Sequence, residues 1–245
     1  GHNVVTPEGV HHTFSQFGAG TLSGVPTLLS RYMMVNPTTL LAEADHLRQH
    51  CGIPNPFDLL RIDRDAIITT PYHIAANRLK EYARGESRHG TVGLGIGETK
   101  ADYLNGLYLR ASDLYSSITL SRKLNELRNT NWLKIKELDL DKTRPDIKRD
   151  LALFEFTDDF LFHCEVLASF SSLVDGRQYL DTMLQLQGDV VFEGAQGVLL
   201  DESCGFAPYN TWSCTLTTNA DVLLDECNRS AERVIGLTRA YATRH

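Results

Sequence analysis

Short apolar runs alternate with segments of helical periodicity along this chain, and that alternation limits the fold more than any other feature. Helical spacing is found within 38–50 and 71–84, and residues 113–187 are mostly helical in pattern with an interruption around 139–145. The apolar runs that we predict as strands lie at 32–36, 58–68, 189–193 and 233–239. Strands separated by helices favour a predominantly parallel central sheet with flanking helices. We therefore expect a single α/β domain over residues 1–245, long enough for one sizeable core.

Local signals place the ends of several helices. Thr38 is predicted to cap a helix that continues to about His50. Pro71 opens the next helix, and Gly85 ends it because glycine tolerates the backbone conformations that follow a helix. A further helix is expected from about 219 to 227.

The composition excludes several classes of protein. The hydrophobic share is 42% and the charged share is 22%, and no apolar run approaches the roughly 20 residues of a membrane-spanning helix. The net charge is −7 and Lys and Arg form no dense cluster, which argues against nucleic-acid binding. No basic-then-apolar leader opens the sequence. We therefore expect a cytoplasmic protein with no nucleic-acid or membrane partner.

The cysteines and histidines give no reason to predict a metal site. The five cysteines are scattered and form no C-x-x-C pair, at positions 51, 164, 204, 214 and 227. This pattern is typical of reduced thiols and argues against a disulfide framework or a zinc site. The nine histidines are dispersed too, and the one adjacent pair, His11 and His12, would point to opposite faces of an extended strand.

A glycine-rich segment, GTVGLGIG at 90–97, is a candidate anion-binding loop. Its glycines carry no Cβ, so several backbone N–H groups can approach one anion. The segment fits neither G-x-x-x-x-G-K-[ST] nor G-x-G-x-x-G. A flexible surface turn is the more common origin of such a run, and both interpretations stay open at this point.

Two further candidates are the sequence FEGAQG and the N-terminal histidine. FEGAQG follows an apolar run, and ligands of open α/β sheets bind just past the carboxyl ends of strands. Gln196 can donate to and accept from the edge of a base, although a turn with Glu193 and Gln196 facing water is equally plausible. His2 is the best candidate for a proton donor at neutral pH, but Gly-His is also a common remnant of tag removal.

Taken together, these segments resemble the adenylosuccinate synthetase family. The order and spacing of that family are shared by GHNVV, GTVGLGIG with ADYLNGLYLRASDL, FEGAQGVLLDESCGFAPYNTWSCT and RAYATRH. The resemblance implies a fold related to P-loop NTPases and a role in purine nucleotide biosynthesis. It implies a GTP- and Mg²⁺-dependent ligase that phosphorylates the 6-oxygen of inosine monophosphate, after which L-aspartate displaces the phosphate to give adenylosuccinate. It also implies a homodimer.

The resemblance assigns roles to individual residues. His2 matches the acid that acts on the phosphoryl group, and the backbone carbonyl of Gly1 matches a Mg²⁺ ligand. Gln196 and Leu200 match residues that line the nucleotide, and Thr211 matches a hydroxyl on its phosphate. The loop that wraps this phosphate is matched by Gly90, Thr91, Val92 and Gly93.

The phosphate loop departs from the family sequence G-T-T-G-R-G-I-G. Val92 replaces a threonine and Leu94 replaces an arginine. Gly106 and Leu107 stand where the family has an Arg-Arg pair, one of which reaches the nucleotide phosphate of the partner subunit. Each lost Arg–phosphate contact removes charge-assisted hydrogen bonds. A non-catalytic nucleotide-binding paralogue, or a synthetase acting on another purine nucleotide such as a deoxyguanylate, therefore stays open as an alternative.

Relative to the family, the chain is expected to be truncated at both ends. It lacks W-G-D-E-G-K-G-K, with the base and the GTP-phosphate loop, and also lacks the aspartate loop and the guanine-binding end. We expect the 245-residue chain alone to be inactive, because catalysis by positioning does not survive the loss of most positioned groups. We also expect the loop at 90–97 and the turn at 194–196 to meet at one cleft.

Overall fold

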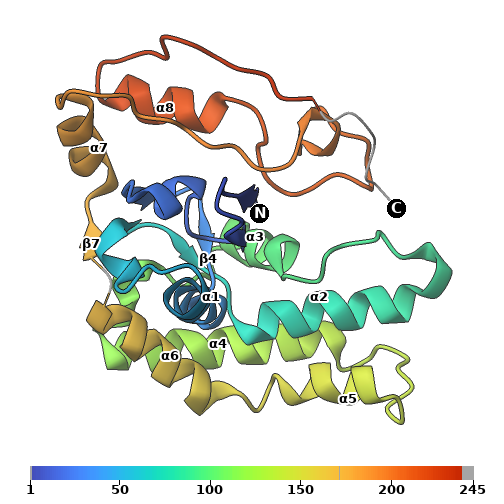
Figure 1. The fold of residues 1–245 in the computed structure, drawn as a ribbon. Helices are drawn as coiled ribbons and strands as arrows, with labels where there is room; N and C mark the ends of the chain where they lie inside the picture. The colour runs from blue at the N-terminus through green and yellow to red at the C-terminus, as the bar shows by residue number, and fades with distance from the viewer. Residues whose placement is uncertain (1, 171, 239–245) are drawn as a thin grey trace.

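The strands of this computed structural model, which describes residues 2–170 and 172–238, form three small sheets (Figure 1). An antiparallel hairpin joins β1 (His2–Val5) to β2 (His11–Phe14). A parallel sheet has the order β3 (Thr27–Leu29), β5 (Leu60–Asp63), β7 (Ser172–Val174). A second parallel pair joins β4 (Met34–Val35) to β6 (Ile67–Ile68). The predicted α/β class, with parallel strands and flanking helices, is confirmed.

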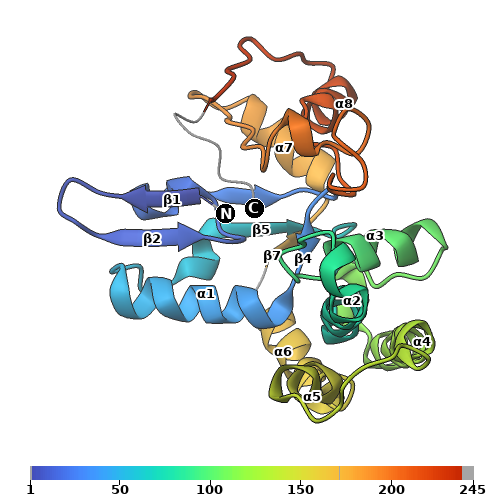
Figure 2. The ribbon, with the colours of Figure 1, turned by 90° about the vertical axis from the view of Figure 1, so that its right-hand side faces the viewer.

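Helices lie on both sides of these strands. The α-helices of the described residues are α1 (Pro37–His50), α2 (Pro71–Arg84), α3 (Ile96–Leu104), α4 (Ser117–Ile135), α5 (Pro145–Ala152), α6 (Thr157–Phe170), α7 (Gly176–Leu184) and α8 (Thr218–Glu226). Short 3₁₀ helices are η1 (Ala19–Ser23), η2 (Pro56–Leu59), η3 (Gly85–Ser87), η4 (Ala111–Tyr115) and η5 (Val198–Leu200). Figure 2 shows α1 along one side of the hairpin and β5, with α7 and α8 on the other side. None of the helices in the described part of the chain combines the length and apolar character that a bilayer crossing requires.

The main hydrophobic core lies between the parallel strands and the helices α1, α2, α4 and α6. Its fully buried side chains include Leu40, Ile62, Tyr72, Leu124 and Phe160. Full burial of such a side chain stabilises the fold by roughly 1.5–3 kcal/mol. Because strand and helix residues share this cluster, their packing holds the strands in place against the helices. A smaller cluster, Leu180, Leu223 and Cys227, joins α7 to α8.

The predicted helix ends are nearly right. The helix α2 begins at Pro71 and has Gly85 as its C-cap, and α8 lies one residue from the predicted range. At α1 the cap is Asn36 rather than Thr38, because the Asn36 side chain accepts the Thr39 N–H at 3.2 Å. Proline then occupies the first helical turn, where its missing N–H costs nothing.

Two of the predicted strands are wrong. Residues 189–193 form no strand, and Val190, Val191 and Phe192 are 39%, 82% and 38% exposed. The preference of apolar residues for strands depends on burial against neighbours, and no strand in the described chain pairs with this run. Residues 233–238 are irregular as well, and the rest of that predicted strand lies outside the described residues.

Strands are present at 32–36 and 58–68, but the second range divides into β5 and β6, which belong to different sheets. β4 pairs with β6, whereas β5 pairs with β3 and β7. β7 itself lies within 113–187, which we predicted as mostly helical. Its three residues are too short to show a strand periodicity in the sequence.

Candidate functional site

The glycine-rich loop at 90–97 connects α2 to α3 and is fixed by a close backbone approach. Gly95 is the N-cap of α3 and has φ of +79°. A Cβ at this position would lie 2.8 Å from the Ile74 backbone nitrogen and 2.9 Å from the His73 carbonyl carbon. Glycine is therefore required at Gly95, both for its conformation and for the contact with α2.

The backbone donors of this loop bind a carboxylate from α2. Glu81 accepts the N–H groups of Gly90 at 2.9 Å, Thr91 at 3.2 Å and His89 at 3.3 Å. Burial tends to raise the pKa of Glu81, but the hydrogen bonds from Thr91, Arg84 and His89 outweigh burial and lower it. The N–H groups of Gly90 and Thr91 thus hold a carboxylate of the same chain, and binding of a separate anion by this loop stays a prediction.

The other face of the loop is held by two further α2 side chains. Asn77 donates to the Thr91 hydroxyl at 3.0 Å, and Arg78 donates to the Gly93 carbonyl at 2.9 Å. In contrast, Val92 is 85% exposed and Leu94 is 48% exposed. The two residues that depart from the family sequence therefore face solvent and carry none of these contacts.

A partly buried charged network ties α3 to α2 and α4 directly behind the loop. Lys134 lies 2.7 Å from Asp102 and 3.2 Å from Glu98, which also pairs with Lys80 at 2.7 Å. Asn131 donates to Asp102 at 2.8 Å. Although burial raises the pKa of Asp102, the adjacent His73 ring and the hydrogen bonds from Lys134 and Asn131 lower it to about 2. The network fixes the helix that follows the loop.

His73 belongs to the same network and was not singled out in the sequence. Its Nδ1 accepts the Thr70 N–H at 3.0 Å, so the ring proton of the neutral form is on Nε2. Nε2 lies 3.3 Å from Asp102 Oδ2 without the alignment of a hydrogen bond. Burial lowers the pKa of His73, which favours the neutral ring. The sequence signal that could have identified His73 is its position three residues after Thr70, in the first turn of a helix that begins with proline.

His2 and Glu193, two residues that the sequence singled out separately, lie in contact. His2 Nδ1 lies 2.8 Å from Glu193 Oε1, and both side chains are half-exposed. The Ala19 N–H donates to Glu193 Oε2 at 3.4 Å. The FEGAQG segment therefore approaches the start of β1 although it forms no strand.

The segment that follows is organised around Asp201. This buried carboxylate accepts the N–H of Ser203 at 2.9 Å and that of Thr215 at 2.7 Å. The Ser203 hydroxyl also donates to Asp201. This hydrogen bond, followed by those from the backbone N–H groups, lowers the pKa of Asp201 strongly. Within the same segment the Thr211 N–H donates to the Leu200 carbonyl at 2.7 Å. Leu200 and Thr211, predicted to contact the nucleotide and its phosphate, are thus brought together, while the role of Asp201 as an organising acceptor was missed.

Other predicted relationships stay untested. Gln196 has a left-handed φ of +67°, which marks a tight turn, and it is exposed. The loop at 90–97 and the turn at 194–196 are linked indirectly, because Lys100 of α3 lies 3.5 Å from Glu202. A cleft shared by the two stays a prediction. Gly1, the predicted Mg²⁺ ligand, lies outside the described residues.

Comparisons with known proteins match the whole chain. The sequence model of the family described as adenylosuccinate synthetase matches residues 1–245. The adenylosuccinate synthetase of Syntrophobacter fumaroxidans is 32% identical over 246 residues, and that of Proteus mirabilis is 30% identical over 251 residues. Each alignment covers 100% of this chain and 54% of the relative, so the chain spans about half the length of the curated relatives it matches.

A solved structure shares the fold. The fully ligated adenylosuccinate synthetase from Plasmodium falciparum superimposes with a TM-score of 0.71 at 19% sequence identity. The match covers 90% of this chain and 48% of that chain.

Proposed function

Because the chain belongs to the adenylosuccinate synthetase family, we propose that the full-length protein joins L-aspartate to inosine monophosphate in a GTP-dependent reaction that forms adenylosuccinate. This reaction places the protein in purine nucleotide biosynthesis. The family match does not favour a non-catalytic paralogue or another purine substrate. A cytoplasmic homodimer is part of the proposal, and the 245-residue chain by itself is expected to be inactive.

The observation that carries the proposal is the pair formed by His2 and Glu193. The Glu193 carboxylate lies 2.8 Å from Nδ1 of His2 and can accept its N–H, which leaves Nε2 to hold the second proton. A ring oriented in this way can act as an acid toward a phosphoryl oxygen at the 6-position of the purine. Glu193 acts as a positioning residue in this account, and His2 as the catalytic residue.

The nucleotide phosphate is proposed to bind the loop that Glu81 now occupies. The N–H groups of Gly90 and Thr91 already converge on the Glu81 carboxylate, and this supports a role in binding an anion. A phosphate has more acceptor oxygens than a carboxylate and can take the same donors once Glu81 turns away. Leu200, which accepts the Thr211 N–H, would line the nucleotide together with Gln196, and the Thr211 hydroxyl would contact the nucleotide phosphate.

GTP and Mg²⁺ enter as the co-substrate and the metal of the family. When bound, Mg²⁺ would neutralise phosphate charge during transfer. The backbone carbonyl of Gly1 is proposed as one of its ligands. The steps assigned to this chain are binding the phosphate, orienting the purine and holding the proton at His2.

Steady-state kinetics of the full-length protein test this function. His2→Asn is expected to lower kcat by roughly 100-fold or more, the usual contribution of a positioned acid, and to leave the Kd for inosine monophosphate nearly unchanged. Glu193→Gln should lower kcat less and alter its pH profile. His163→Asn, in α6, serves as the matched control. Unchanged kcat in His2→Asn, or no GTP- and aspartate-dependent turnover by the wild type, would contradict the proposal.

A further inference from the structure

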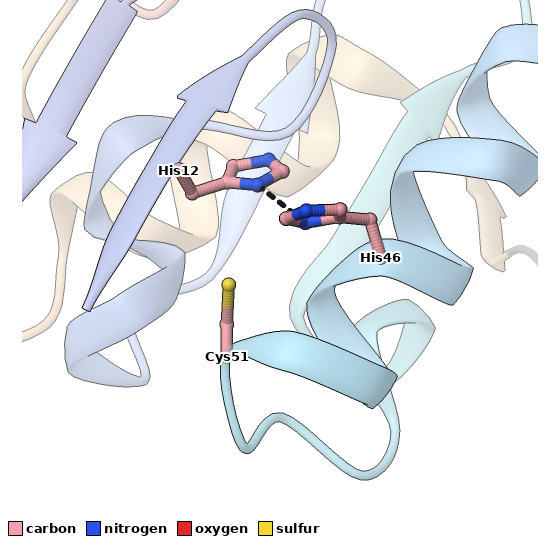
Figure 3. A group of neighbouring side chains, drawn as sticks. All are labelled: His12, His46 and Cys51. Atoms are coloured by element: carbon pink, nitrogen blue, oxygen red, sulfur yellow. Dashed lines mark hydrogen bonds between the residues drawn. The ribbon is translucent and has the colours of Figure 1, made fainter.

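A side chain of the hairpin and two side chains from the end of α1 converge at one place (Figure 3). His12 comes from β2, His46 from the last turns of α1, and Cys51 is the C-cap of α1. One potential ligand atom from each residue lies within 4.8 Å of the other two. His12 Nδ1 and His46 Nδ1 face each other at 3.0 Å, the contact drawn as a dashed line in Figure 3.

A buried carboxylate orients the first of these rings. Glu43 Oε1 lies 3.4 Å from His12 Nε2, and both side chains are buried. Glu43 is itself held by the N–H groups of Ser15 at 2.7 Å and Gln16 at 2.8 Å. With Nε2–H directed at the carboxylate, the lone pair of His12 Nδ1 points toward His46. A histidine that ligates a metal through one ring nitrogen usually donates its other ring N–H to a group such as a carboxylate.

The donor set and its dimensions suit a zinc ion. Tetrahedral zinc has Zn–N distances of about 2.0–2.1 Å and Zn–S of about 2.3 Å, so its ligand atoms lie roughly 3.3–3.6 Å apart. The two nitrogens are already near that separation, and the thiol has to approach by roughly 1 Å, which a side-chain rotation at a helix end can supply. The carboxyl end of α1 also carries the negative pole of the helix dipole, which favours a cation.

The cluster leaves room for a fourth ligand. A cavity of about 400 Å³ opens beside it, lined by His11, Thr13, Ser15 and Ala42 in addition to His12, Glu43 and His46. Water can therefore complete the coordination. His50 is a second source, because its ring centroid lies 4.7 Å from that of His46.

We propose that His12, His46 and Cys51 bind one zinc ion that braces the β1–β2 hairpin against the end of α1. A simple hydrogen bond between the two rings would explain the contact of His12 with His46. It would not explain why the Cys51 thiol lies close to both rings, or why the Glu43 carboxylate lies beside His12 Nε2. The hairpin register places His12 opposite Val4 and His2 opposite Phe14. The ion would therefore stabilise the strand that carries His2, whether or not the proposed reaction is correct.

Cobalt substitution tests this site directly. The full chain, freed of metal with a chelator, is titrated with Co²⁺ and then with Zn²⁺. We expect one ion per chain, with the thiolate-to-cobalt charge-transfer band and the strong visible bands of four-coordinate Co²⁺. Zn²⁺ should displace the Co²⁺ and raise the midpoint of thermal unfolding, because the folded state binds the ion preferentially.

Variants separate this site from the rest of the chain. Cys51→Ser should abolish the charge-transfer band, and His46→Gln should weaken Zn²⁺ binding by roughly 100-fold or more, beyond the loss expected for an outer-shell partner. Cys204→Ser and His163→Gln are the matched controls and should bind as the wild type does. Thermal unfolding without metal shows that each variant folds. The absence of a thiolate band, or equal affinity in Cys51→Ser, His46→Gln and wild type, would overturn the proposal.

Discussion

The Glu81 carboxylate accepts the Gly90 N–H at 2.9 Å, so the donors of the proposed phosphate loop already hold a negative charge. A bound phosphate would have to displace that charge or be repelled by it. Glu81→Gln removes the charge and keeps an acceptor for the loop. We expect about tenfold tighter binding of inosine monophosphate, near 1.4 kcal/mol, in calorimetry on the full-length protein. Glu86→Gln, an exposed residue of η3, is the control. Weaker binding by Glu81→Gln would show that Glu81 supports the loop instead of competing with the ligand.

The exposed residues of the same loop provide a gain-of-affinity test. Val92→Thr and Leu94→Arg together restore a hydroxyl and a cation without disturbing the core, since both side chains face solvent. Each new charge-assisted contact should contribute roughly 1.5–3 kcal/mol, or about one to two decades in affinity. Calorimetry with inosine monophosphate measures the change, and Leu104→Arg supplies a cation away from the loop as the control. Low-micromolar binding by the wild type with no gain in the double variant would mean that Val92 and Leu94 do not weaken the binding of inosine monophosphate.

Gly95 is expected to be the least replaceable glycine of the loop. Gly95→Ala forces a side chain into a left-handed conformation and into contact with the α2 backbone at 2.8 Å. The free energy of unfolding should fall by about 1–3 kcal/mol or more in urea denaturation. Gly97→Ala is the matched control, because its Cβ would meet nothing within 4 Å and helix propensity favours alanine. Equal stability of the two variants would contradict the close approach.

Asp102 should make part of the free energy of unfolding depend on pH in the acid range. Its folded pKa of about 2 lies below the ordinary 3.8, so the unfolded chain binds more protons as the pH falls through this window. The contribution is therefore complete above about pH 4 and is lost toward pH 2. Between about pH 6 and about pH 3 the loss should be about 1 kcal/mol. In urea denaturation, Asp102→Asn should lose less unfolding free energy over this pH range than the wild type, by that amount. The control Asp139→Asn, at an exposed position, should lose as much as the wild type. The same acid loss in Asp102→Asn and wild type would exclude this role.

The sequence predicted well those features that are encoded locally. The start of α2 at Pro71 and its end at Gly85 follow from the backbone restrictions of proline and glycine. His2 and the glycine-rich loop were candidates from the residues alone, and the resemblance to the family gave them specific roles. The strand at 189–193 failed because three apolar residues do not specify what covers them, and here their side chains stay exposed.

The contacts that define the sites were not predictable from spacing. Glu81 reaches Gly90 because α2 ends and the chain folds back along the helix, which a residue count does not reveal. His12 and His46 belong to different elements, a strand and a helix, that the core brings together. Asp201 looks like an ordinary loop carboxylate until its five donors from Ser203, Cys204 and Thr215 are seen in three dimensions.

The pairing of β5 with β7 has a consequence for how the chain folds. Asp63 lies opposite Val174, and the whole of α2 to α6 lies between these residues in the sequence. Closing so long a loop has an entropic cost that no local contact offsets, and parallel pairing of this kind forms slowly. The free edge of β5 therefore stays exposed until the intervening helices have assembled. Unpaired strand edges are templates for association with other chains, so we expect this interval to be when the folding chain is most vulnerable to aggregation.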